Sequence, residues 1–108
     1  MSEKELKTFS EFWPYYLGEH RLPRNRFLHY MGTSFSTLIF LWMLLSQNWW
    51  LFLVALVAGY GPAWVGHFFL EKNRPATFTY PLWSLAADYK MFYYAITGRL
   101  KRELAKYF

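Results

Sequence analysis

The stretch that decides the fold of this protein is FLHYMGTSFSTLIFLWMLLSQNWWLFLVALVAGYGPAWVGHFFL, from Phe27 to Leu70. It runs for 44 residues without a single Asp, Glu, Lys or Arg. One α-helix needs roughly 20 residues to cross the hydrocarbon core of a membrane, so there is room for two helices and a tight turn. The compact polar cluster Ser46-Gln47-Asn48 is the predicted turn. The sequence therefore predicts two membrane spans, at about 27–46 and 49–70.

The composition of the whole chain supports the same environment. Of 108 residues, 55% are hydrophobic and 24% aromatic, which is more apolar surface than a soluble domain of this size can bury. The chain contains no cysteine, which excludes disulfides and thiolate metal sites. The net charge is +5, but the basic residues flank the apolar segments, so we expect them to meet anionic lipid head groups and expect no nucleic-acid partner.

The distribution of basic residues predicts the orientation of the hairpin. Five Lys or Arg precede Phe27, seven follow Leu70, and none lies between them. Positive charge accumulates on the cytoplasmic side of membrane proteins, so both ends of the chain are predicted to be cytoplasmic. The segment Met1–Lys7 mixes both signs of charge and no short apolar core follows it, so we expect no removable signal peptide.

The flanking segments predict further helices. The aromatic segment 9–20 is typical of a short interfacial helix. The segment 81–97 is apolar but carries Asp88 and Lys90, each of which costs about 2.5–3.5 kcal/mol at mid-bilayer. It is expected at the interface, with a third span as the alternative, and both charges are interpreted as surface or packing charges. The predicted fold is an all-α integral membrane protein with a single membrane domain over 1–108. It is a two-span helical hairpin plus flanking interfacial helices, about four helices in all.

Two histidines are predicted to lie at a similar depth in the hairpin. His29 is 18 residues before Gln47, and His67 is 20 residues after it. At about 1.5 Å per residue these separations are roughly 27 and 30 Å. Both rings are therefore expected near the cytoplasmic end of their helix, on neighbouring spans.

Other polar residues are expected on the same side. His67 and Glu71 are four residues apart and share one helical face, as do Asn25 and His29. His20 lies just before the first span. The three histidines and Glu71 are therefore predicted to converge as a catalytic and metal-binding site, with Asn25 as a nearby hydrogen-bonding group.

Imidazoles together with a carboxylate suit a divalent first-row metal, with Fe(II) preferred and zinc as the alternative. The simpler interpretation stays open, because polar residues near the ends of spans also hydrogen-bond between helices or meet head groups. Arg21, Arg24 and Arg26 are interpreted as ligands of lipid phosphates or of an acidic substrate head group.

Three segments resemble a known family. The segments are FWPYYLGEHRLPRNRFLHYMGT, AGYGPAWVGHFFLEKNRPATFTYPLWSL and DYKMFYYAITGRL. The first contains the motif H-x4-N-x3-H and the second contains G-H-x3-E-K-x2-P-A, and the similarity extends from about Phe9 to Leu100. The three segments closely resemble bacterial members of the 2-hydroxy fatty acid dioxygenase-like membrane proteins, formerly a domain of unknown function. The motif positions in this sequence are His20, Asn25, His29, Gly66, His67, Glu71, Lys72, Pro75 and Ala76.

The resemblance implies an Fe(II)-dependent dioxygenase of fatty acid α-oxidation that shortens a 2-hydroxy fatty acid by one carbon. It implies the histidines as metal ligands, and O2, membrane lipids and a fatty acyl substrate as partners. A bacterial inner-membrane location is expected, and a homo-oligomer is compatible with the sequence. The substrate-binding residues are predicted to be Arg21, Arg24, Arg26, Lys72 and Asn25. The main alternative is a non-enzymatic lipid-binding or scaffolding membrane protein. A four-span exporter would need roughly 80 apolar residues and fits less well.

Overall fold

The computed structural model describes residues 6–108. The expectation of no signal peptide rests largely on residues 1–5, which lie outside the described part. The chain is 80% helical, with five α-helices and no strand among residues 6–108. Two of these helices are long and apolar enough to cross a membrane, so the predicted all-α fold with a two-span hairpin is confirmed.

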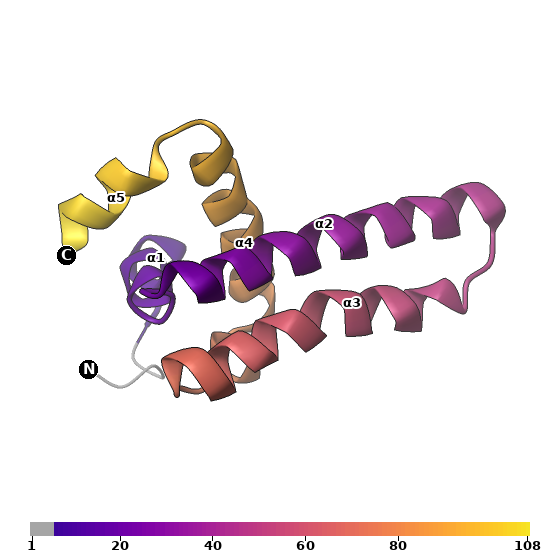
Figure 1. The fold of residues 1–108 in the computed structure, drawn as a ribbon, viewed down its shortest axis with the longest axis horizontal. Helices are drawn as coiled ribbons and strands as arrows, with labels where there is room; N and C mark the ends of the chain where they lie inside the picture. Colours follow the sequence, from indigo (N-terminus) through magenta and orange to yellow (C-terminus); the bar gives the residue numbers. More distant parts are fainter. Residues whose placement is uncertain (1–5) are drawn as a thin grey trace.

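The hairpin is formed by α2 (Pro23–Ser46) and α3 (Leu51–Val65), which continues as the π-helix η2 (Gly66–Glu71) (Figure 1). Pro23 occupies the first turn of α2, where its missing N–H costs nothing. Gln47 ends α2 in the left-handed region, with φ 58°. In the most apolar 18-residue stretch of each candidate span, 17% of the residues are buried for Pro23–Ser46 and 28% for Leu51–Glu71. Most of the apolar side chains of the hairpin therefore face outward.

Small residues bring α2 and α3 close together. A Cβ on Gly32 would lie 2.8 Å from the carbonyl oxygen of Gly59. One turn further along α2, the Ser36 hydroxyl donates a hydrogen bond of 2.8 Å to the carbonyl of Ala55. Such contacts are typical of helices that pack within a membrane, where close backbone approach replaces the hydrophobic effect as the stabilising interaction.

The π-helical turn η2 carries one of the histidines. At the end of η2 the His67 carbonyl accepts hydrogen bonds from the backbone N–H groups of both Lys72 and Asn73, five and six residues further along the chain. Lys72 has φ 57° and ends the helix in the left-handed region. Short π-helical segments inside α-helices are frequent at functional sites, because the extra residue per turn changes the direction in which side chains point.

The remaining helices gather at the end of the hairpin opposite its turn (Figure 1). They are α1 (Phe9–Gly18), the 3-10 turn η3 (Ala76–Phe78), α4 (Pro81–Ile96) and α5 (Leu100–Tyr107). Helix α4 is 16 residues long and packs against α1 and α2. The core that they share is made of the buried residues Leu6, Phe12, Trp13, Tyr16, Leu17, Ala76, Ala87, Met91 and Leu100.

Helix α5 adds a fifth helix to the approximately four that the sequence predicts. Its Leu100 is buried in the shared core, and the indole Nε1 of Trp13 donates a hydrogen bond of 2.9 Å to Glu103. This helix is held by contacts with α4 and with α1, which lies about ninety positions earlier in the chain.

Candidate metal centre

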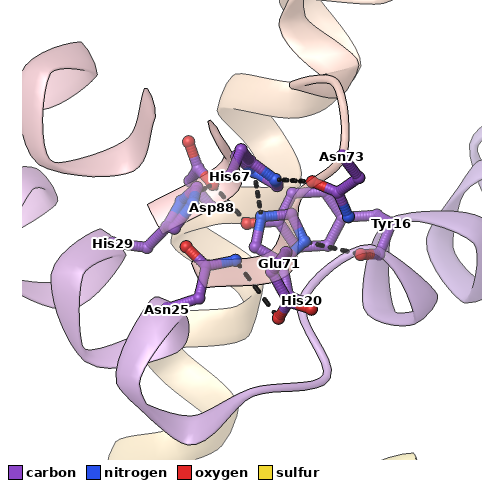
Figure 2. A network of polar contacts seen from close by, with 8 residues as sticks. All are labelled: Tyr16, His20, Asn25, His29, His67, Glu71, Asn73 and Asp88. Carbon is purple, nitrogen blue, oxygen red and sulfur yellow. Dashed lines mark hydrogen bonds and ion pairs between the residues drawn. The ribbon is translucent and has the colours of Figure 1, made fainter. Parts of the chain in front are cut away.

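The structure brings the three histidines together at the level where the short helices meet the hairpin. His20 lies in the loop between α1 and α2, His29 on α2 and His67 on η2. All three side chains are buried, and one ring nitrogen from each lies within 4.8 Å of the other two. Figure 2 shows the three rings at the centre of a network of polar contacts.

The orientation of the His20 ring is fixed by α1. Its Nδ1 lies 2.6 Å from the backbone carbonyl of Tyr16, which can only accept, so Nδ1 carries the proton. The Tyr16 ring also stacks on the imidazole, with centroids 4.0 Å apart. Burial, and then the neighbouring His29 and His67, hold the pKa of His20 well below its ordinary value of 6.5. The ring is therefore neutral, with its lone pair on Nε2.

His67 is held in the same tautomer by Asn73. The amide nitrogen of Asn73 donates to the backbone carbonyl and to the carboxylate of Glu19, both at 3.1 Å. This fixes the amide so that its oxygen faces the imidazole, and it lies 2.7 Å from Nδ1 of His67. The proton of His67 is consequently on Nδ1 and the lone pair on Nε2.

His29 is held by a carboxylate. Its Nδ1 lies 3.1 Å from Oδ1 of Asp88, which also accepts a hydrogen bond from the hydroxyl of Tyr16. The other ring nitrogen, Nε2, is buried and has no hydrogen-bond partner in the described part of the chain. A buried polar atom without a protein partner is costly, and its lone pair is available to a metal ion.

The sequence predicts a surface or packing charge at Asp88, but the structure places this carboxylate beside the histidines (Figure 2). The carboxylate is on α4, and only the packing of α4 against α2 brings it to His29. The signal that could have revealed it is an ionisable residue within an apolar helix, which is functional by default in membrane proteins.

The three histidines fit a metal ion. All three Nδ1 protons are engaged, so three Nε2 lone pairs remain. Nε2 of His20 and Nε2 of His67 lie 3.0 Å apart without a proton between them, which is repulsive unless a cation binds both. Two neighbouring ligands about 2.1 Å from a metal and at right angles are separated by roughly 3.0 Å. The partners of the Nδ1 atoms are of the kind that orient metal-binding imidazoles.

A small cavity of about 10 Å³ adjoins the histidines, roughly the room of one water molecule or ion. Its lining includes Asp88, the one carboxylate there, and the buried hydroxyl of Ser84, which has no hydrogen-bond partner among the described residues. Tyr60 and Trp64 of α3 also line it. A polar cavity of this size, with an unpaired donor and a carboxylate, has room for one oxygen atom of a polar head group beside the metal ligands.

The cations predicted to bind substrate do not line this cavity. Arg26 donates hydrogen bonds of 2.8 Å to the carbonyls of His20 and Arg21, which stabilises the loop before α2. Arg21 lies over the ring of Phe108. Arg24 and Lys72 are exposed.

Glu71 and Asn25 lie together at the edge of the site, apart from the three converging ring nitrogens (Figure 2). The Glu71 carboxylate accepts from the backbone N–H of Leu22 at 2.6 Å and from the Asn25 amide at 3.4 Å. The amide oxygen of Asn25 lies 1.8 Å from the place that a Cβ on Gly66 would occupy. This pair connects the start of α2 to η2.

The fold and the site define a helical protein with a membrane-type hairpin and a buried cluster of three histidines able to hold a metal ion. The chain belongs to the family described as 2-hydroxy-palmitic acid dioxygenase Mpo1-like, whose match covers residues 6–100. No curated protein and no solved structure gives a match.

Proposed function

We propose that this protein is an Fe(II)-dependent membrane dioxygenase that shortens 2-hydroxy fatty acids by one carbon. The observation that carries the proposal is the convergence of His20, His29 and His67, whose Nδ1 protons are all engaged elsewhere. Three neutral imidazoles leave coordination positions open for other ligands. Membership of a dioxygenase-like family favours iron over zinc, since zinc has no redox chemistry.

The proposed reaction balances without an external reductant. A 2-hydroxy acid and O2 give the acid that is one carbon shorter, together with carbon dioxide and water. The bond between C1 and C2 breaks, C2 becomes the new carboxyl carbon, and the substrate supplies all four electrons that O2 accepts. When bound, the iron supplies the oxygen chemistry, which no side chain of this protein provides.

The residues of the cavity have separate roles in this proposal. Asp88 holds His29 and accepts the proton of the substrate 2-hydroxyl at its carboxylate, as the one carboxylate in the cavity lining. Ser84 donates its unpaired hydroxyl to the substrate carboxylate. Tyr16 donates to Asp88, and its pKa is raised by burial and by that carboxylate, so the phenol stays protonated.

The remaining sequence predictions concern the membrane orientation of the hairpin and the charged residues around the site. We propose that the hairpin crosses a bacterial inner membrane with both ends cytoplasmic. Arg21, Arg24 and Lys72 then lie at the level of the lipid head groups, where they bind phosphates and draw anionic fatty acids to the site. Glu71 serves as the link between η2 and the start of α2.

The test is the metal content of protein purified in mild detergent, measured by mass spectrometry for the wild type, His29→Ala, His67→Ala and Glu71→Gln. We expect near-stoichiometric iron in the wild type, its loss in both histidine variants and its retention in Glu71→Gln. The iron-loaded wild type should convert 2-hydroxyhexadecanoic acid under oxygen to the acid one carbon shorter.

Glu71→Gln is the matched control, because it alters a polar residue beside the site but leaves the three imidazoles in place. Iron that survives in His67→Ala would refute the three-histidine site. Folded wild-type protein without metal would favour the non-enzymatic alternative, in which the histidines only hold the helices together. Loss of iron in Glu71→Gln would make that carboxylate a fourth ligand.

A further inference from the structure

A groove extends from the histidine cavity along the hairpin. It has a volume of about 210 Å³ and lies between α2, α3 and α4. We call it the tail groove and define it by Ser36, Ala55, Leu56, Gly59 and Tyr89, together with the two residues that connect it to the cavity.

Those two residues are Tyr60 and Asp88, which line both the cavity and the tail groove. From Tyr60 the groove follows α3 toward the turn as far as Phe52. These eight residues correspond to about 12 Å at the rise of an α-helix. The tail groove therefore begins beside the proposed reaction centre and leads into the part of the hairpin that lies within the membrane.

The floor of the tail groove is apolar because its polar group is satisfied internally. Ala55 and Gly59 have little or no side chain, and the Ser36 hydroxyl donates to the Ala55 carbonyl at 2.8 Å. The rest of the lining on this side is mainly apolar, with Thr33 as a further hydroxyl. It therefore fits a chain of methylene groups.

One wall is fixed by a contact between helices. The hydroxyls of Thr37 and Tyr89 lie 2.5 Å apart, and this contact holds the Tyr89 ring in place. Tyr89 lines both the tail groove and a neighbouring apolar hollow. Helix α4 packs against α2, and residues of α4 line the tail groove together with residues of α3.

We infer that the tail groove binds the hydrocarbon tail of a 2-hydroxy acid whose head group lies beside Asp88 with one oxygen in the cavity, and that the tail points toward the hairpin turn. The inference rests on the proposed function and adds the position of the tail and the residues that select its length. A tail leaving the lipid for this groove gains little hydrophobic energy, because both surroundings are apolar. The groove instead orients the C1–C2 bond at the metal and selects among chain lengths.

The experiment narrows the groove at Leu56, which is 38% exposed and so tolerates a larger side chain. Leu56→Trp should lower kcat/KM for 2-hydroxyhexadecanoic acid at least about ten-fold and change it less than about two-fold for 2-hydroxybutanoic acid, whose tail is too short to reach Leu56. The matched control is Val57→Trp, the adjacent residue of α3, which is 71% exposed and does not line the groove. Val57→Trp should leave kcat/KM unchanged for both substrates. The wild type and the two tryptophan variants should all contain the same amount of metal.

A second measurement does not depend on turnover. A 2-hydroxy acid with a photoreactive diazirine at its far end is irradiated with the purified protein, and the labelled residues are mapped by mass spectrometry. We expect labels concentrated between Phe52 and Leu56, and reduced in Leu56→Trp but not in Val57→Trp. Labels spread evenly over the exposed faces of α2 and α3, or equal effects of the two tryptophan variants, would overturn the inference. A wild type that is labelled there but does not turn over 2-hydroxy acids would refute the proposed function alone.

Discussion

Nδ1 of His29 lies 3.1 Å from Oδ1 of Asp88, and the two residues are 59 positions apart in the chain. Together with Tyr16, which donates to the same carboxylate, they connect three helices at one point. The carboxylate sets the tautomer of His29 and thereby directs its Nε2 to the other two imidazoles.

Asp88→Asn should weaken metal binding by about 10- to 100-fold, because the amide no longer fixes the charge and the tautomer of His29. The measurement is competition with a chelator of known affinity, followed by metal analysis. Lys90→Gln is the matched control, since it removes a charge two residues away that lies over the Trp13 ring. Equal metal affinity in wild type and Asp88→Asn would contradict the role given to this carboxylate.

Ser84→Ala should raise KM for 2-hydroxy acids while leaving metal content unchanged. The hydroxyl is buried, lines the cavity and has no partner in the described structure, so we assign it to the substrate carboxylate. Loss of one hydrogen bond to a charged group corresponds to about 1.5–3 kcal/mol, or roughly a ten- to hundred-fold rise. Steady-state kinetics across substrate concentrations measures it. A fall in kcat alone, with KM unchanged, would place Ser84 outside head-group binding.

Gly66→Ala should destabilise the protein by about 1–3 kcal/mol, because the new methyl group overlaps the buried Asn25 side chain, 1.8 Å away. Gly61→Ala is the control in the same helical segment, since nothing lies within 4 Å of its added Cβ. Thermal unfolding in detergent distinguishes the two. Adding Asn25→Ala to Gly66→Ala should restore part of the lost stability. Equal unfolding temperatures for both glycine variants would contradict the contact.

The metal-free protein should lose stability as the pH falls below about 6.5. The unfolded chain binds a proton at His20 near that pH, whereas burial lowers the pKa in the folded protein, so acid favours the unfolded state. The contribution of His20 to the free energy of unfolding is complete above pH 6.5. Below that pH it decreases by up to about 1.4 kcal/mol per pH unit. Unfolding temperatures between pH 7.5 and 5 measure this, with His20→Gln as the variant in which the slope becomes shallower. A flat profile in the wild type would contradict the prediction.

The sequence by itself determined the hairpin. A run of 44 uncharged residues with one polar interruption has few alternatives, because a backbone in lipid must satisfy its hydrogen bonds within helices. The similar distances of His29 and His67 from the turn likewise follow from the constant rise of a helix, and the structure brings these two rings together.

Only the tertiary structure decided which polar groups surround those rings. Asp88 and Ser84 lie on α4, and no spacing within one helix relates them to His29 or His67. Glu71 shares a helical face with His67 in an α-helix, but η2 is a π-helix, and the Glu71 carboxylate bonds to Leu22. Helical periodicity fixes positions along one element, whereas packing between elements depends on contacts that are distant in sequence. That physical difference is why the hairpin could be predicted and the partners of the histidines could not.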